Sequence, residues 1–197
     1  MLANIQKICA TSLVAWLVMA PVAQAARVLD KNIGWPGRTL EGIPCSGGGQ
    51  GYGPYDYMDE TQRRERLPIV ESAHFTSSVR ELIKGNTGTL FGDLDYTLRA
   101  FPNHHPALYA MIKLNLRGDK VTTPAECYLQ RANVFNPDDG TVLFLFGIYL
   151  HRLHRLDQAL VRYKQALQLM PNDVELNYNV GLAYAEMGKY EEAANYG

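Results

Sequence analysis

The sequence lacks an excess of charge of either sign. Its 19 lysine and arginine residues nearly balance 20 aspartate and glutamate residues. No basic stripe runs along any segment, so the electrostatic footprint of a nucleic-acid-binding protein is missing. We therefore expect no nucleic-acid partner.

Cysteine is scarce, with three residues in the chain. Cys9 lies in the N-terminal apolar segment, which leaves Cys45 and Cys127. Neither belongs to a C-x-x-C or C-x-x-C-H motif, so a thioredoxin-like redox site and covalently attached haem are unsupported. Two cysteines in an oxidising compartment are candidates for a disulfide bond. Two buried free thiols are the alternative.

Motifs for nucleotide binding and nucleophilic catalysis are missing as well. The run Gly47-Gly48-Gly49 lacks the following Lys-Ser/Thr that would hold phosphate and metal. Ser46 does not sit in the G-x-S-x-G pattern of a nucleophile elbow. No set of nucleophile, base and orienting group is suggested. We predict no enzyme and no cofactor.

The first 25 residues have the pattern of a signal peptide. Lys7 supplies the positive charge, and the apolar run from Ile8 to Ala20 is too short to span a bilayer securely. Ala23-Gln24-Ala25 is an A-x-A cleavage site. We expect cleavage after Ala25, a periplasmic or secreted protein, and no membrane span after cleavage. A retained membrane anchor is the alternative.

The next two segments differ in pattern. Residues 26–66 are rich in glycine, proline and tyrosine without a helical or strand period, which predicts an extended, poorly structured segment tethered through Cys45. Residues 67–104 carry apolar side chains at helical spacings and predict a helical N-terminal module. Ser78 followed by Glu81 resembles a helix-capping box.

A repeat of period 34 occupies the C-terminal part of the chain. Small residues and prolines recur 34 positions apart, and the pairs are Pro137 and Pro171, Gly147 and Gly181, and Ala159 and Ala193. This pattern resembles the tetratricopeptide repeat, which has a small residue in its first helix, an alanine-rich second helix and a closing proline. The resemblance implies an all-α solenoid of helix-turn-helix units that binds other proteins and lacks catalysis of its own.

The frame of this repeat divides residues 105–197 into three units. Residues 105–138 form a degenerate unit, residues 140–173 a regular one, and residues 174–197 a unit cut within its second helix. We expect further repeats or a capping helix in a longer protein. Gly147 and Gly181 are expected where the two helices of a unit cross.

The resemblance also implies a binding surface, because this family binds partners on a concave face lined by first helices. The expected partner-binding residues are Phe144, Ile148, His151, Arg152, Tyr178, Asn179 and Leu182. Phe144 and Tyr178 are expected to anchor a protein or peptide partner, since aromatic residues dominate interface energies. Arg152 and Asn179 are expected to orient its polar groups.

Histidines suggest a second hypothesis. Glu71 and His74 have the E-x-x-H spacing that places both side chains on one helical face, and His104-His105 lies further along the chain. A metal-binding protein or metal-dependent enzyme using His74, His104 and His105 is therefore the alternative function. The E-x-x-H pair is half of the zincin signature, which needs two histidines on one helix.

Overall fold

The structure, a computed structural model, describes residues 33–196. All regular elements in that range are helical, which confirms the predicted all-α class. They are α1 (Glu60–His74), α2 (Ser77–Arg80), α3 (Leu90–Ala100), α4 (His105–Leu116), α5 (Ala125–Phe135), α6 (Gly140–Arg152), α7 (Leu156–Leu169), α8 (Val174–Glu186), α9 (Tyr190–Ala193) and a 3₁₀ turn at Ala194–Tyr196. The expected signal peptide lies outside the described residues.

Short polar side chains begin the repeat helices. The carboxylate of Asp139 accepts a hydrogen bond from the amide of Val142 at the start of α6, and Asp173 does the same for Leu176 at the start of α8. These bonds satisfy amides that have no partner within the helix. Both aspartates follow a proline by two residues, so the sequence marks where each unit begins.

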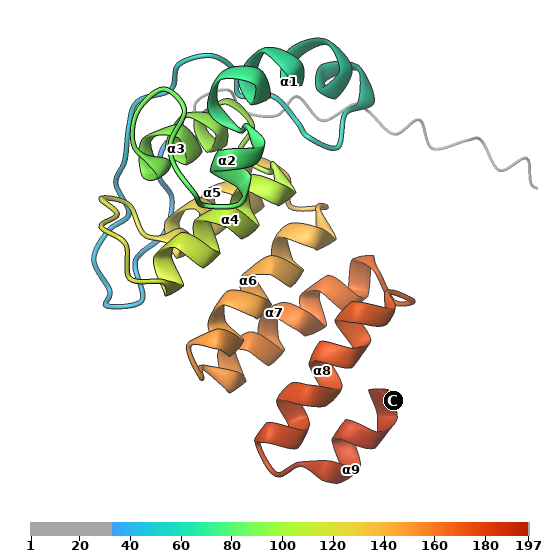
Figure 1. Ribbon diagram of the computed structural model, residues 1–197. Helices are drawn as coiled ribbons and strands as arrows, with labels where there is room; N and C mark the ends of the chain where they lie inside the picture. Colours follow the sequence, from blue (N-terminus) through green and yellow to red (C-terminus); the bar gives the residue numbers. More distant parts are fainter. Residues whose placement is uncertain (1–32, 197) are drawn as a thin grey trace, which may run out of the picture.

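The helices stack as antiparallel pairs (Figure 1). α6 and α7 form the most extensively packed pair, and α8 lies next to α7. A Cβ atom at Gly147 would overlap the ring of Tyr163 on α7, so only glycine permits this close crossing. Gly181 is less tightly packed, because a Cβ there would lie 3.4 Å from the Ala193 carbonyl oxygen.

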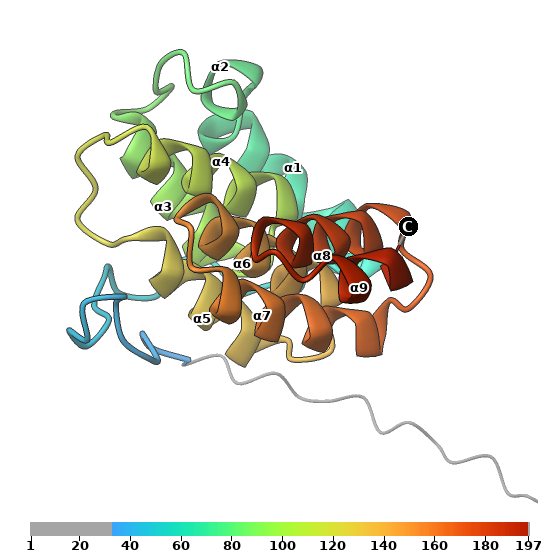
Figure 2. The same ribbon diagram turned by 90° about the horizontal axis from the view of Figure 1, so that it is seen from below.

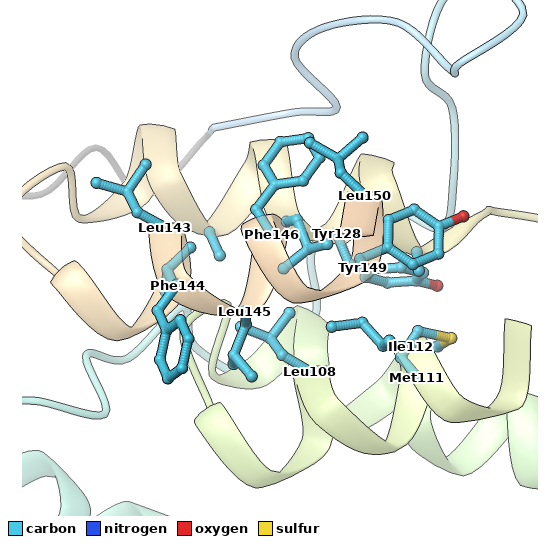
Figure 3. Close-up of a cluster of buried hydrophobic side chains, with 14 of the residues drawn as sticks. Leu108, Met111, Ile112, Tyr128, Leu143, Phe144, Leu145, Phe146, Tyr149 and Leu150 are labelled. Carbon is cyan, nitrogen blue, oxygen red and sulfur yellow. The ribbon is translucent and has the colours of Figure 1, made fainter. Parts of the chain in front are cut away.

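One buried cluster runs from α2 to α8. Its large members in the middle of the stack come from α4, α5 and α6, and they are Leu108, Met111, Ile112, Tyr128, Leu145, Phe146, Tyr149 and Leu150 (Figure 3). α6 contributes to both sides of this core because Phe144 and Phe146 point to opposite sides of the helix. α6 therefore packs against neighbouring elements on both of its sides.

The helical N-terminal module begins earlier than expected. α1 starts at Glu60 rather than at residue 67, because the Asp59 carboxylate caps it by accepting from the Gln62 amide. Pro68 lies inside α1. The expected capping box at Ser78 is absent: α2 has only four residues, and Thr76 precedes it without a side-chain cap.

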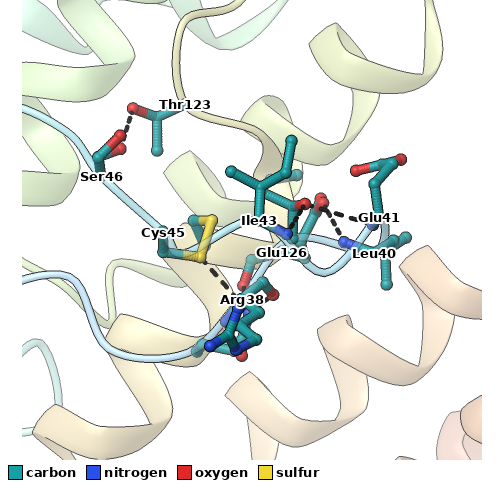
Figure 4. Close-up of a disulfide and its surroundings, with 12 residues drawn as sticks. Arg38, Leu40, Glu41, Ile43, Cys45, Ser46, Thr123 and Glu126 are labelled. Atoms are coloured by element: carbon teal, nitrogen blue, oxygen red, sulfur yellow. Dashed lines mark hydrogen bonds between the residues drawn. A yellow bond between two sulfur atoms is a disulfide. The ribbon is translucent and has the colours of Figure 1, made fainter.

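The described part of the extended segment, residues 33–59, has no helix but is firmly anchored. Cys45 forms the predicted disulfide with Cys127 on α5, with 5.6 Å between the Cα atoms (Figure 4). Trp35 packs edge-on against Tyr128, with 5.0 Å between ring centroids. Figure 2 shows this segment lying along the end of the stack that holds α3 and α5. Side-chain contacts therefore order a segment that has no secondary-structure period.

Candidate functional site

A groove of about 550 Å³ lies between α6 and α8 and extends to α4. α6 and α8 are the first helices of consecutive units, so the groove lies on the face that the sequence analysis singled out. Six of the seven expected residues line it, and they are Phe144, Ile148, His151, Arg152, Asn179 and Leu182. The structure thus brings these six side chains together, and what they bind stays a prediction.

Tyr178 is the expected residue that does not line the groove. Its side chain is 65% exposed. Phe144, at the equivalent position of the preceding unit, is 7% exposed and lies 5.9 Å from the Tyr163 ring, centroid to centroid. Most of the Phe144 surface is therefore already covered by its own fold. Leu182, at 38% exposed, offers more apolar surface to a partner.

Several lining residues were missed by sequence reasoning. Tyr109 comes from α4, in the degenerate unit whose register the repeat pattern defines poorly, and it is partly exposed in the groove. Tyr163 comes from the second helix of its unit, where the period alone predicts only core packing. Burial raises the pKa of Tyr163, so its hydroxyl stays protonated and can donate or accept hydrogen bonds.

His151 forms part of the groove wall and is held on two sides. Its Nδ1 lies 3.2 Å from the Tyr163 hydroxyl, and its Nε2 lies 3.2 Å from the Glu186 carboxylate. The ring bridges α7 and α8 from its place on α6. His151 therefore fixes the spacing of the three helices at one end of the groove, in addition to presenting a polar edge to it.

Charged side chains stand at both ends of the groove, Arg152 and Glu186 at one end and Glu175 at the other. Arg152 lies at the C-terminal end of α6 and Glu175 at the N-terminal end of α8, and neither forms an ion pair within residues 33–196. Between them lie Phe144, Ile148 and Leu182. From Thr141 to Arg152, α6 presents about three turns, or roughly 16 Å of groove length. That length matches about five residues of extended peptide.

The three histidines of the metal hypothesis have separate carboxylate partners. His74 Nδ1 lies 2.9 Å from Asp93, His104 Nε2 lies 3.1 Å from Glu71, and His105 Nε2 lies 2.8 Å from Asp139. In the described part of the chain, no three histidine, cysteine or acidic side chains are grouped as metal ligands would be. The geometry assigns these histidines to pairs that join helices.

His104 in particular is a structural residue. It is fully buried, its Nδ1 accepts the amide of Ala107 at the start of α4, and its Nε2–H donates to Glu71 on α1. Burial lowers the pKa of His104, and the hydrogen bond from His104 lowers the pKa of Glu71. Both ring nitrogens are thus used in joining α4 to α1, and neither is left for a metal.

Residues 33–196 contain no helix with both the length and the apolar character needed to cross a bilayer. One sequence similarity falls on the repeats. Residues 147–188 match the family model described as TPR repeat. The peroxisomal targeting signal receptor of Candida glabrata is 32% identical over 78 residues, which cover 40% of this chain and 13% of the receptor. The receptor of Saccharomyces cerevisiae is 32% identical over 71 residues, 36% of this chain and 11% of that receptor. The chain therefore matches only a small part of these relatives.

MamA shares the fold of this chain. The crystal structure of MamA superposes with a TM-score of 0.50 at 19% identity, covering 70% of this chain and 79% of that one. YrrB, a TPR protein described as having an unusual peptide-binding site, is 27% identical with a TM-score of 0.43, covering 54% of this chain and 55% of that one. Residues 147–188 thus carry a TPR repeat, and the paired helices around Gly147 have the fold seen in MamA.

Proposed function

We propose that this chain is a non-catalytic scaffold that holds a segment of a partner protein in the groove between α6 and α8. The groove itself carries the proposal: an apolar centre is exposed to solvent between Glu175 at one end and Arg152 with Glu186 at the other. Such a surface suits an extended peptide with an apolar anchor. The curated relatives that match part of this chain are named as receptors for a targeting signal, which supports a protein segment as the ligand.

The periplasm is the proposed location. The support is the predicted signal segment and the disulfide between Cys45 and Cys127, which persists best in an oxidising compartment. Mass spectrometry of the protein recovered from a periplasmic fraction tests this, and we expect a mature N-terminus at Ala26. Recovery of the uncleaved chain from the membrane fraction would contradict it.

Photo-crosslinking tests the groove. A benzophenone side chain placed at Leu182 should form adducts with the partner, whereas the same group at Ile69 should not, because Ile69 is exposed on α1 far from the groove. The partner identified by mass spectrometry is then purified and titrated against variants. Leu182→Ala should weaken binding by about 1–2 kcal/mol, and Ile69→Ala should leave it unchanged. Equal effects of the two variants would rule out the groove as the binding site.

A further inference from the structure

A second pocket lies on the opposite side of α6 from the groove. We call it the back pocket and define it by Arg38, Leu40, Gln130, Phe146, Leu150, Gln158, Val161 and Arg162. Its volume is about 250 Å³. Figure 3 shows Phe146 and Leu150 pointing away from Phe144, so the two sites use different faces of one helix. The back pocket has no part in the proposed groove function.

The floor of the back pocket is apolar and its edge is cationic. The Arg162 guanidinium lies over the Phe146 ring, 4.6 Å from its centroid, and donates one hydrogen bond to Gln165. The Arg38 guanidinium donates to the carbonyl of Gly42. Neither arginine forms an ion pair within residues 33–196. Burial lowers the pKa of Arg162, which shows that its charge is partly removed from water without a compensating carboxylate.

A partly buried guanidinium without an ion-pair partner favours the binding of an anion. Its planar fork matches a carboxylate in two parallel hydrogen bonds, and partial burial strengthens such bonds relative to water. The apolar floor beside the two arginines adds a requirement for an apolar group next to that carboxylate. The volume is below the range of about 300–1,000 Å³ that holds drug-sized ligands, so it suits one or two side chains.

We propose that the back pocket binds a short acidic-apolar segment of a protein partner. An apolar side chain of the segment packs on Phe146 and Leu150, and a neighbouring carboxylate bonds the guanidiniums of Arg38 and Arg162. Gln158, on the same rim, is placed to bond a backbone group of the segment. The partner in the groove and the segment in the back pocket occupy opposite sides of α6, so both bind at once.

The back pocket depends on the disulfide, because part of its lining comes from the extended segment, residues 33–59. Arg38 and Leu40 belong to the segment that Cys45 ties to α5 (Figure 4). Gln130 of α5 accepts from the Arg38 amide and donates to the Arg38 carbonyl, which holds one wall of the pocket in register. Reduction of the disulfide loosens that wall and leaves the groove lining, which comes from α4, α6, α7 and α8, intact.

Amide chemical shifts of the ¹⁵N-labelled, oxidised protein test the proposal. The probe is an acetylated and amidated peptide, Ser-Gly-Glu-Leu-Glu-Gly-Ser, and the control peptide carries glutamine in place of both glutamates. We expect saturable shifts at Leu40, Val161 and Arg162 with the acidic peptide, and none there with the control. Absence of saturable shifts up to about 5 mM, a binding free energy weaker than roughly 3 kcal/mol, overturns the proposal. So does equal binding of both peptides.

Variants and a second probe complete the test. Arg162→Gln and Arg38→Gln should each weaken the acidic peptide about tenfold, the loss of one charge-assisted hydrogen-bonded contact. Arg64→Gln, which removes an exposed arginine of α1, should leave the affinity unchanged. Reduction should weaken the peptide at least as much as Arg38→Gln. Unchanged affinity in the reduced protein would overturn the dependence of the back pocket on the disulfide. Shifts with decanoate but not with the peptide would overturn a protein segment as the ligand.

Discussion

At the scale of single residues, Gly147 decides how closely α6 and α7 approach. Its missing side chain leaves room for the Tyr163 ring, which also reaches the groove and contacts His151. The same ring therefore fills a helix crossing and forms part of the candidate site. Gly181 has the same place in the repeat, yet its surroundings are looser. Equal spacing in the sequence does not imply equal packing.

A matched pair of substitutions measures this difference. Gly147→Ala should lower the free energy of unfolding by about 1–3 kcal/mol, because the new methyl group overlaps the Tyr163 ring and forces the helices apart. Gly181→Ala should be neutral or stabilising by up to about 1 kcal/mol, since its methyl group fits and alanine favours a helix. Urea denaturation of both variants gives the comparison. Equal losses of stability would show that the crossing at Gly147 is not specially tight.

At the scale of elements, the extended segment at residues 33–59 lies across the outside of the stack, and we call it the strap. The disulfide fixes it at Cys45, the Arg99 guanidinium donates to the Gly49 carbonyl, and Arg131 donates to the Gly34 carbonyl. Burial lowers the pKa of Arg131 to about 10, so this guanidinium is still charged at neutral pH. The strap thus supplies carbonyl acceptors to arginines on α3 and α5.

Cutting the disulfide should loosen the strap and lower stability. The two cysteines are 82 residues apart, and the chain-entropy treatment gives about 4–5 kcal/mol for a loop of that size, with measured values often nearer 2–4. We expect Cys45→Ser with Cys127→Ser to lose about 2–4 kcal/mol in urea denaturation. Limited proteolysis should then cut first within residues 33–59. Unchanged stability and an uncut strap would show that the arginine and tryptophan contacts suffice without the bond.

The expected and observed helices differ in how well the sequence alone predicts where they begin. Helices α4, α6 and α8 begin at His105, Gly140 and Val174, where the 34-residue frame begins its three units, and a proline and an aspartate lie just before both α6 and α8. α1 and α2 were misplaced, because their ends depend on contacts with other elements that no local pattern encodes. In the groove, the residues on the first helices could be predicted from the 34-residue period of the sequence. Tyr109 and the back pocket could not, since both require knowing which distant segments meet.

At the scale of the whole molecule, buried histidine–carboxylate pairs join the N-terminal module to the stack. His104 links α4 to Glu71 on α1, and His105 links α4 to Asp139, the residue that caps α6. Asn103 extends this network by donating to Asp139 and to Asp56 of the strap. These polar groups hold the module, strap and repeats together where apolar packing alone would permit sliding.

This network makes stability depend on pH with a definite sign. Burial lowers the pKa of His104, so the unfolded chain takes up a proton below about pH 6.5 that the folded protein resists. Burial alone would raise the pKa of Asp93, but hydrogen bonds from Thr87, His74 and nearby backbone amides hold it below 3.8. Both groups have depressed pKa values when folded. Their contribution is therefore complete at neutral pH and declines on acidification, first through His104 and then through Asp93.

Asp93→Asn separates the two stages. The variant should lose about 1–3 kcal/mol at pH 7, because a carboxylate that accepts from His74, Thr87 and the Asn86 amide is replaced by a neutral amide. Below about pH 4 its stability should approach that of the wild-type protein, since wild-type Asp93 then loses its advantage as the unfolded chain takes up a proton. The decline between pH 6.5 and 5, which belongs to His104, should be the same in both proteins. Urea denaturation at pH 7, 5.5, 4 and 3 measures the difference, and two stability curves that stay parallel down to pH 3 would contradict the role given to Asp93.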